Sequence, residues 1–285
     1  MTPQDFDFLR KLLRQRSGLV LSAEKQYLAE SRLLPVARKH GMTNLAELVG
    51  KLRGAGSSPL TAEVVEAMTT NETFFFRDKL PFEHFRATIL PALLTARARE
   101  KRLRIWCAAA STGQEPYSLA MILREMHAVL DGWRVDILAT DLCGAVLDRA
   151  RAGIYSQFEV QRGLPIGLLV ENFSQVGEQW QISEALRAMV RFRPINLLND
   201  FSALGGFDIV FCRNVLIYFD QETKIGVLDR LARQMAADGF LVLGAAETVV
   251  GLTHAFHGVP DKRGLYAPNA AAVAANNVVK FAAQG

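Results

Sequence analysis

The chain has 285 residues, of which 50% are hydrophobic and 22% are charged. This is an ordinary globular composition, and it excludes a disordered or fibrous chain. The net charge of +4 allows an acidic partner but does not require one. A chain of this length buries about three quarters of the surface that it exposes when unfolded, so it needs no disulfide or structural metal.

The N-terminal part, residues 1–68, is predicted to form a helical domain. Apolar residues recur at helical spacing in four segments, and no strand-like run interrupts them. Gly41 is expected to end the second helix, and Pro35 must kink that helix or split it. The stretch GAGSSP (54–59) predicts a loop before the fourth helix.

From about residue 80, strand-like runs alternate with helical segments. The strand-like runs are 103–108, 133–141, 207–212 and 239–245. This alternation predicts an α/β fold, in which a mostly parallel sheet carries helices on both faces. A hairpin is expected near 258–268, and the Ala- and Asn-rich tail (269–285) is expected to be poorly ordered.

The three cysteines indicate the cellular compartment. Cys107, Cys143 and Cys212 each lie in or beside an apolar segment, and none belongs to a Cys-x-x-Cys pair. Their odd number and their surroundings favour buried free thiols in a reducing compartment. The stretch MTPQDFDFLRKLLRQR lacks the apolar core of a signal peptide, and no apolar run is long enough to span a bilayer. We therefore expect a soluble cytoplasmic protein without membrane insertion.

Small residues follow the first predicted strand, in the stretch AAASTGQEPY (108–117). A turn of small residues between a strand and a helix lets the backbone approach a ligand closely. Gly113 is the only glycine in this turn, which argues against a pyrophosphate and for a smaller, nucleoside-type ligand. Glu115 places a carboxylate where it suits a ligand ammonium group. A plain tight turn with an acid at the helix start explains this stretch equally well.

Polar residues also follow two other predicted strands. Asp141 ends the second strand, where an acid can accept hydrogen bonds from both hydroxyls of a ribose, or else caps the next helix. Arg213 and Asn214 follow the strand 207–212, and Tyr218 lies four residues beyond Asn214. Carboxyl ends of parallel strands line the ligand crevice, so we favour a binding role over simple helix capping.

Other catalytic patterns are missing from the sequence. His254 and His257 are three residues apart with no obvious third ligand nearby, so we expect no metal site. There is no Gly-x-Ser-x-Gly motif, and no nucleic-acid-binding motif accompanies the basic charge.

The stretch NETFFFRD (71–78) fits no regular pattern. Its three consecutive phenylalanines match neither helical nor strand periodicity, and side chains that require hydrogen bonds flank them on both sides. Such a segment suggests an apolar plug that is held in place by polar neighbours.

In chain order, the notable motifs are MTTNETFFFRD, CAAASTGQEPYSLAM, ILATDL, RARAGIY, INLL and FDIVFCRNVLIYFD. Together they resemble the chemotaxis receptor (methyl-accepting protein) glutamate O-methyltransferase family of the CheR type, over about residues 1–268. The resemblance implies methyl transfer from S-adenosylmethionine to receptor glutamates, giving γ-glutamyl methyl esters and S-adenosylhomocysteine. It also implies a cofactor-covering linker (69–80) and a Rossmann-like S-adenosylmethionine-dependent methyltransferase domain (81–268) with a small antiparallel β insert (168–193).

The resemblance also assigns the cofactor site, residue by residue. Asn71, Thr73 and Arg77 contact the methionine end, Ala108 lies in the small-residue turn, Glu115 binds the amino group, Asp141 binds the ribose, Asn196 and Leu197 bind the adenine, and Arg213 and Asn214 complete the pocket. The phenylalanines anchor their segment and help to exclude water. Gln114 replaces an acid that many members carry, and because Glu115 is retained we expect little consequence.

The implied chemistry needs no general base. A glutamate carboxylate, with a pKa of about 4.3, is already ionised at neutral pH. It must instead lose its water and line up with the sulfonium methyl group. Arg77 is expected to orient the acceptor carboxylate, and Tyr218 is expected to line the transfer site, which makes these two the predicted catalytic residues.

Two other functions stay open: methylation of another protein or a small acid, and a non-catalytic cofactor-sensing docking protein. The presence of both Arg77 and Tyr218 argues against the second of these.

Two further expectations concern partners. Residues 1–66 carry ten Lys/Arg and seven Asp/Glu, a net charge of +3, so a basic face with Arg10 and Arg14 is expected to dock on acidic cytoplasmic receptor helices. A merely solvated face is the alternative. Members that bind a receptor C-terminal pentapeptide resemble one another in a longer, glycine-rich loop in the insert. Here the corresponding stretch, 172–182, has only Gly177, so we expect independence from that pentapeptide.

Overall fold

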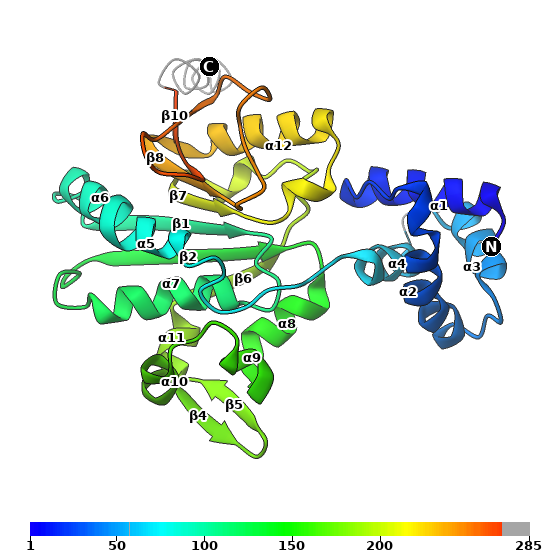
Figure 1. Ribbon diagram of the computed structural model, residues 1–285, viewed down its shortest axis with the longest axis horizontal. Coiled ribbons are helices and arrows are strands. Elements are labelled where there is room, and N and C mark those ends of the chain that lie inside the picture. Colours follow the sequence, from blue (N-terminus) through cyan, green and yellow to red (C-terminus); the bar gives the residue numbers. More distant parts are fainter. Residues whose placement is uncertain (57, 270–285) are drawn as a thin grey trace. The chain divides into compact units, whose positions relative to one another are not determined.

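The computed structural model describes residues 1–56 and 58–269, which form two compact units (Figure 1). The helical unit comprises Met1–Thr70 and Tyr218–Lys224. The sheet unit comprises Asn71–Ile217 and the described residues from Ile225 onward. Residues 218–224 were predicted to belong to the catalytic domain, whereas the structure groups them with the N-terminal helices. The predicted tail lies outside the described residues, apart from Asn269.

The N-terminal part of the helical unit, Met1–Thr70, contains four α-helices and a short 3₁₀ turn among its described residues. They are α1 (Pro3–Ser17), η1 (Ala23–Lys25), α2 (Gln26–Lys39), α3 (Leu45–Ala55) and α4 (Pro59–Met68). Thr2 and Asp5 form a capping box at the start of α1, and the Asn44 and Ser58 side chains cap α3 and α4. Pro35 lies inside α2 without splitting it.

The main sheet of the sheet unit has seven strands in the order β6-β2-β1-β7-β8-β10-β9. Their bounds are β1 (Arg102–Ala108), β2 (Arg134–Asp141), β6 (Val190–Pro194), β7 (Phe207–Cys212), β8 (Met235–Leu243), β9 (Phe256–Gly258) and β10 (Leu265–Pro268). The first five in spatial order pair in parallel, and β9 and β10 form an antiparallel hairpin. The predicted mostly parallel sheet and the C-terminal hairpin are therefore confirmed.

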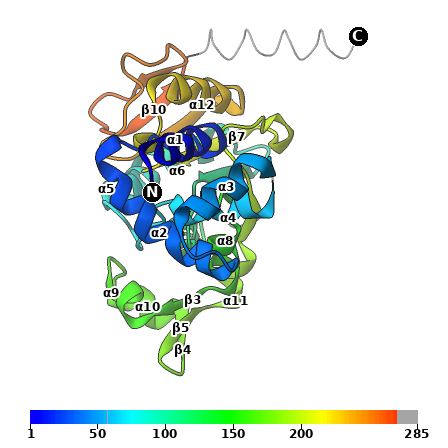
Figure 2. The ribbon, with the colours of Figure 1, turned by 90° about the vertical axis from the view of Figure 1, so that its right-hand side faces the viewer.

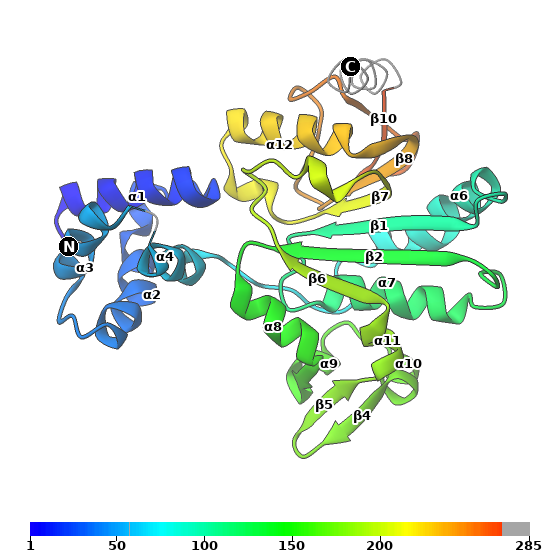
Figure 3. The same ribbon diagram turned by 180° about the vertical axis from the view of Figure 1, so that it is seen from behind.

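Helices accompany this sheet, and Figures 1 and 3 show it from two sides. They are α5 (Leu80–His84), the π-helical turn η2 (Phe85–Ile89), α6 (Leu90–Ala96), α7 (Gln114–Glu125), α8 (Gly144–Ala152) and α12 (Gln221–Arg233), with short 3₁₀ turns η3 (Ser202–Leu204) and η4 (Leu216–Tyr218). The consecutive side chains of Ile105, Trp106 and Cys107 are fully buried. Because successive strand residues point to opposite faces, both faces of β1 are covered.

A second, three-stranded antiparallel sheet has the order β3-β5-β4. It consists of β3 (Ile154–Ser156), β4 (Phe173–Val176) and β5 (Gln179–Ile182), and α9 (Gln157–Gln161), α10 (Ile166–Asn172) and α11 (Glu184–Ala188) accompany it (Figure 2). The predicted insert, 168–193, is therefore wrong at both ends. It omits β3, which is too short to show periodicity, and it includes β6, which pairs with β2 in the main sheet.

Candidate active site

The residues predicted to bind a ligand gather at one edge of the main sheet. The strands β1, β2 and β7 run in parallel, with Ala108 opposite Thr140 and Cys212 in the register. The segments that follow these strands therefore emerge at the same edge, which brings the turn after Ala108 beside Asp141 and Arg213. Chain topology alone thus assembles three of the segments that the sequence analysis selected.

The turn between β1 and α7 has an unusual backbone. Three of its residues have positive φ angles: 62° at Ala109, 50° at Ser111 and 93° at Gly113. A non-glycine residue in this region costs roughly 1–2 kcal/mol, and such strain is concentrated at ligand-binding sites. The turn is held by the Ala110 N–H, which donates to the Thr140 carbonyl oxygen over 2.8 Å.

Asp141 is fixed by backbone N–H groups from both sides. Its Oδ2 accepts from the Ser111 N–H at 2.8 Å, and its Oδ1 accepts from the Cys143 N–H at 3.0 Å. The helix α8 begins after Cys143, so this second bond lies outside the helix. These bonds favour orientation of the carboxylate at the sheet edge over helix capping, the alternative reading of Asp141.

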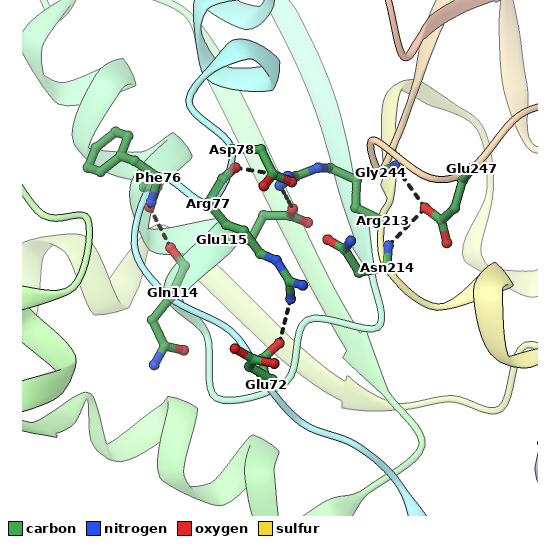
Figure 4. A network of polar contacts seen from close by, with 11 residues as sticks. Glu72, Phe76, Arg77, Asp78, Gln114, Glu115, Arg213, Asn214, Gly244 and Glu247 are labelled. Atoms are coloured by element: carbon green, nitrogen blue, oxygen red, sulfur yellow. Dashed lines mark hydrogen bonds and ion pairs between the residues drawn. The ribbon is translucent and has the colours of Figure 1, made fainter.

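Glu115 and Arg213 form a buried ion pair (Figure 4). The Arg213 Nη1 lies 2.6 Å from the Glu115 Oε2, and the Arg213 side chain is only 2% exposed. Burial raises the pKa of the Glu115 carboxyl group, and the Arg213 guanidinium offsets part of that rise. The Nη2 of Arg213 donates to the Arg77 carbonyl oxygen and to Asp78 Oδ2, both at 2.8 Å. Arg213 therefore joins three segments and does not cap the next helix.

That next helix, α12, has a different cap. The Thr223 N–H donates to Asp220 Oδ1 at 2.8 Å, so Asp220 caps α12.

Phe75 anchors the segment 71–78 in the core. Its side chain is fully buried, and its ring centroid lies 5.1 Å from that of Tyr155 and 5.6 Å from that of Phe173. At Gly163 a Cβ would lie 2.1 Å from the Phe75 carbonyl oxygen, so only glycine permits this approach. The middle phenylalanine thus ties the segment to the small sheet.

The two outer phenylalanines have other neighbours. The Phe76 ring packs 5.3 Å from Phe82, and its N–H donates to Ser118 Oγ at 3.0 Å. The guanidinium carbons of Arg77 and Arg162 lie 5.7 Å and 4.3 Å from the Phe74 ring centroid. The three consecutive rings therefore serve three separate contacts, which explains why they follow no regular period.

Polar contacts hold the start of the same segment. The Ser111 hydroxyl donates to the Asn71 carbonyl oxygen at 2.8 Å, which joins the segment to the strained turn. The Arg77 Nη1 donates to the Glu72 carbonyl oxygen at 2.7 Å (Figure 4). Thr73 lies between Glu72 and Arg77 in the sequence, and it is half-buried.

The loop after β6 lies beside Asp141. The Ile195 N–H donates to the Asp141 carbonyl oxygen at 2.9 Å, so Asn196 and Leu197 directly follow this contact. Leu197 is buried, and its carbonyl oxygen accepts from Arg230 Nη2 at 2.7 Å. The structure therefore brings these two residues to the same edge as Asp141.

Tyr218 belongs to the helical unit, unlike the other predicted site residues. Its carbonyl oxygen accepts from the Val20 N–H at 2.8 Å. Tyr218 was predicted to belong to the catalytic domain, in which it lies four positions beyond Asn214. Such proximity along the chain does not reveal which unit a residue packs into.

Sequence reasoning also missed two acids at this site. Asp78 was quoted in the motif but received no role, and it contacts Arg213. Glu247 lies just beyond β8, and its carboxylate accepts from backbone N–H groups of the segment after β7. Its position as an acid beyond the carboxyl end of a strand was the only available signal.

The side chains at this edge suit a nucleoside that carries an amino-acid end. Asp141 is an oriented acceptor at the end of the second strand, as a ribose requires. Glu115 is a carboxylate that suits an ammonium group, and the strained turn brings backbone close to the edge. The donor and acceptor set therefore fits the cofactor implied by the resemblance.

Other chemistry receives less support from the described residues. Cys107, Cys143 and Cys212 are buried, and burial raises the thiol pKa of Cys107 and Cys212, which opposes thiolate formation. Across residues 1–56 and 58–269, no group of three or more His, Cys, Asp or Glu side chains is arranged to hold a metal ion. In the same ranges, no helix combines the length and the apolar character required to cross a membrane.

Comparison with known proteins identifies the family. The family described as "CheR methyltransferase, SAM binding domain" matches residues 71–265, and "CheR methyltransferase, all-alpha domain" matches residues 4–69. "Chemotaxis protein methyltransferase 1" of Pseudomonas aeruginosa is 43% identical over 87% of this chain and 91% of its own length. The protein of the same name from Vibrio cholerae is 38% identical over 93% of this chain and 96% of its own length.

Among solved structures, a TehB-like SAM-dependent methyltransferase from Corynebacterium glutamicum has 17% identity and a TM-score of 0.35, covering 62% of this chain and 84% of that one. The two family matches together span nearly all of the described residues, and they confirm the resemblance, the fold class and the use of S-adenosylmethionine. The chain belongs to the CheR methyltransferase family.

Proposed function

We propose that the chain transfers methyl groups from S-adenosylmethionine to glutamate side chains of chemoreceptors in the cytoplasm, as part of sensory adaptation. The observation that carries this proposal is the match to proteins named as chemotaxis protein methyltransferases, at 43% and 38% identity over most of the chain. The match includes the helical region as well as the cofactor-binding region, so it extends beyond the parts that methyltransferases in general share.

The sheet edge supports a specific set of cofactor contacts. In this proposal Asp141 accepts from the ribose hydroxyls, and Glu115 accepts from the cofactor ammonium group. The remaining contacts come from Asn71, Thr73 and Arg77 at the methionine end, Asn196 and Leu197 at the adenine, and Ala108, Arg213 and Asn214 around the pocket. Burial of the Glu115–Arg213 pair favours this arrangement. A cation on the ligand stabilises the ionised form of a carboxylate, and this attraction is stronger when the carboxylate is shielded from water.

The transfer requires positioning more than proton chemistry. S-adenosylmethionine supplies a methyl group on a positively charged sulfur. A bond forms between a glutamate oxygen and the methyl carbon while the carbon–sulfur bond breaks, and its electron pair stays on sulfur. The acceptor is already ionised, so the chain has only to orient and desolvate it. We assign orientation to Arg77 and lining of the transfer site to Tyr218.

The two cations expected to dock on acidic receptor helices, Arg10 and Arg14, have partners within the chain. Arg10 Nε donates to the Leu21 carbonyl oxygen at 2.6 Å, and Arg14 Nε lies 2.6 Å from Asp220 Oδ2. Both guanidinium groups are therefore engaged inside the helical unit. Lys25 and Arg38 are exposed on the same unit, and within the described residues no side-chain hydrogen bond or ion pair engages either of them. We assign docking to these cations, and reversing both to Glu should flatten the salt dependence of receptor binding.

The small sheet is consistent with independence from a receptor C-terminal pentapeptide. Val176 pairs with Gln179, so only Gly177 and Glu178 connect β4 to β5. A two-residue turn leaves no long loop to clasp a peptide, although β4 lies at an edge of its sheet. Micromolar binding of such a pentapeptide that maps to residues 168–193 would overturn this part of the proposal.

The substrate class can be tested with labelled cofactor. Purified chain is incubated with methyl-labelled S-adenosylmethionine and either receptor-containing membranes, receptor-free membranes or soluble extract. We expect label only on receptors in the first sample. Transfer to soluble proteins or small acids with none to receptors would favour the other methyltransferase function, and cofactor binding without any transfer would favour the sensor.

A further inference from the structure

Glu247 lies in a nest of backbone N–H groups. Its side chain follows β8, and the residue is 9% exposed. Oε2 accepts from the N–H groups of Asn214 and Gly244 at 2.8 Å and 2.7 Å (Figure 4). Oε1 accepts from Val215, Leu216 and Ile217, at 2.9 Å, 2.8 Å and 3.3 Å. One carboxylate thus receives five backbone donors.

These donors explain why the segment after β7 needs an anion. Four consecutive N–H groups, from Asn214 to Ile217, point to one place and have no strand partner there. A buried N–H without an acceptor costs about 1–3 kcal/mol, so an uncompensated cluster would not persist. Successive N–H groups that converge form an anion-binding concavity. In this chain, Glu247 fills that concavity from within.

The contact also explains two backbone features. Asn214 has a φ of 59°, in the left-handed region that asparagine adopts more readily than most other non-glycine residues, and the bond from its N–H to Glu247 holds it there. At Gly244, an added Cβ would lie 2.7 Å from Glu247 Oε2 and 3.0 Å from the Asn214 nitrogen. Position 244 therefore admits only glycine while Glu247 occupies its place. The ends of β7 and β8, which pair side by side, are joined through this carboxylate.

We propose that Glu247 is a positioning residue of the cofactor site. It touches neither cofactor nor acceptor in this role. It acts by fixing the backbone at Asn214, next to Arg213, so that both side chains are held ready for the cofactor. The inference rests on the proposed cofactor contacts of Arg213 and Asn214, and its test separates the two.

Glu247→Gln is a sharp test because the side chain keeps its size, but one of its two acceptor oxygens is replaced by an NH₂ donor. In either amide orientation, the new NH₂ group faces at least two backbone N–H donors. The nest must then open, whereas the strands on each side keep their pairing. Gly244→Ala should also open the nest, but in a different way. It keeps the negative charge of Glu247, and its added methyl group displaces the carboxylate. Asp208→Asn is the matched control, since Asp208 also accepts a backbone N–H, from Arg104, but at the opposite end of β7.

The experiment has two readouts, both without turnover. Hydrogen exchange of the ligand-free protein reports the backbone amides of 214–217, and calorimetry reports affinity for S-adenosylhomocysteine. We expect Glu247→Gln and Gly244→Ala to speed exchange at 214–217 and to weaken affinity by roughly tenfold to a hundredfold, the scale of a misplacement near 1 Å. Below the melting temperature of the variant, Asp208→Asn should change neither the exchange at 214–217 nor the affinity for S-adenosylhomocysteine.

Asn214→Ala distinguishes the possible failures. If this variant loses affinity while Glu247→Gln and Gly244→Ala bind as the wild type does, Glu247 is not a positioning residue and the inference is overturned. If Asn214→Ala binds normally while Glu247→Gln opens the nest, the proposed cofactor contact of Asn214 fails instead. Faster exchange together with weaker binding in both nest variants supports the inference.

Discussion

Two adjacent stretches after β7 are held by different parts of the molecule. Arg213–Ile217 belongs to the sheet unit, where Glu115 and Glu247 hold it. Tyr218–Lys224 belongs to the helical unit, where the Val20 N–H holds the Tyr218 carbonyl oxygen and Arg14 pairs with Asp220. The peptide bond after Ile217 is thus a boundary between two sets of contacts.

This difference suggests that the two stretches have separate roles. The proposed cofactor contacts after β7 depend on the sheet unit alone, whereas the proposed transfer residue Tyr218 depends on the helical unit. Changes on the sheet side should therefore alter cofactor affinity. Changes on the helical side should alter turnover and leave affinity for S-adenosylhomocysteine as it was.

The largest effect is expected on the sheet side, from Asp141→Ala. This change removes the acceptor proposed for two ribose hydroxyls and also the acceptor of the Ser111 and Cys143 N–H groups. Loss of hydrogen bonds to a charged group should weaken S-adenosylhomocysteine binding by about 3 kcal/mol, as measured by calorimetry. Asp208→Asn serves as the control. Equal affinity of Asp141→Ala and wild type would remove Asp141 from the site.

The next effect concerns the two proposed catalytic residues. Arg77→Ala removes a charge-assisted contact to the acceptor and should slow methylation by about 2 kcal/mol of activation free energy at saturating cofactor. Tyr218→Phe keeps the ring and should slow turnover less. Full rates for both variants would show that neither residue acts in the transfer step.

A smaller effect should follow from Arg14→Gln, which removes the ion pair with Asp220. The Arg14 side chain is 58% exposed, and an exposed pair contributes about 1 kcal/mol or less, so turnover should fall by no more than about fivefold. Affinity for S-adenosylhomocysteine should stay unchanged. Lys11→Gln, which breaks an exposed pair with Asp7, is the matched control and should change neither quantity. A loss of cofactor affinity in Arg14→Gln would contradict the division between the two stretches.

The smallest effect is a pH dependence of the segment 218–224. The Thr223 backbone N–H and its hydroxyl group, with Arg14, lower the pKa of Asp220 below its ordinary value. A carboxyl group whose pKa is lower in the folded state stabilises the fold above its unfolded pKa, near 4. That contribution is lost as the pH falls through the lower, folded value. The free energies of unfolding of wild type and Asp220→Asn, measured between pH 6 and about pH 3, should therefore converge at the acid end. A constant difference between the two proteins across this range would exclude the effect.

Much of this arrangement could be predicted from the sequence, for a physical reason. Parallel strands end at one sheet edge, so identifying the strands before Ala109, Asp141 and Arg213 was enough to bring these residues together. The strand β3 was missed because three residues show no period. The partner of Arg14 could not be predicted, because it is Asp220, 206 positions away, and no local pattern reveals such a pair.

Glu247 was missed for a related reason. Its role depends on five N–H groups, four of which lie about thirty residues earlier in the chain. Nothing near Glu247 in the sequence indicates that those donors converge. The positive φ of Asn214 is likewise visible only in the folded backbone.

The most direct test of the whole account is the chemical nature of the product. Receptors labelled by the wild-type chain are treated with mild alkali, and the volatile label is collected as methanol. Because the proposed acceptor is a glutamate carboxylate, the account predicts that the label leaves as methanol and that Arg77→Ala yields much less of it in the same time. Label that remains on the receptor through alkali would show methylation of nitrogen, and it would contradict the proposed function.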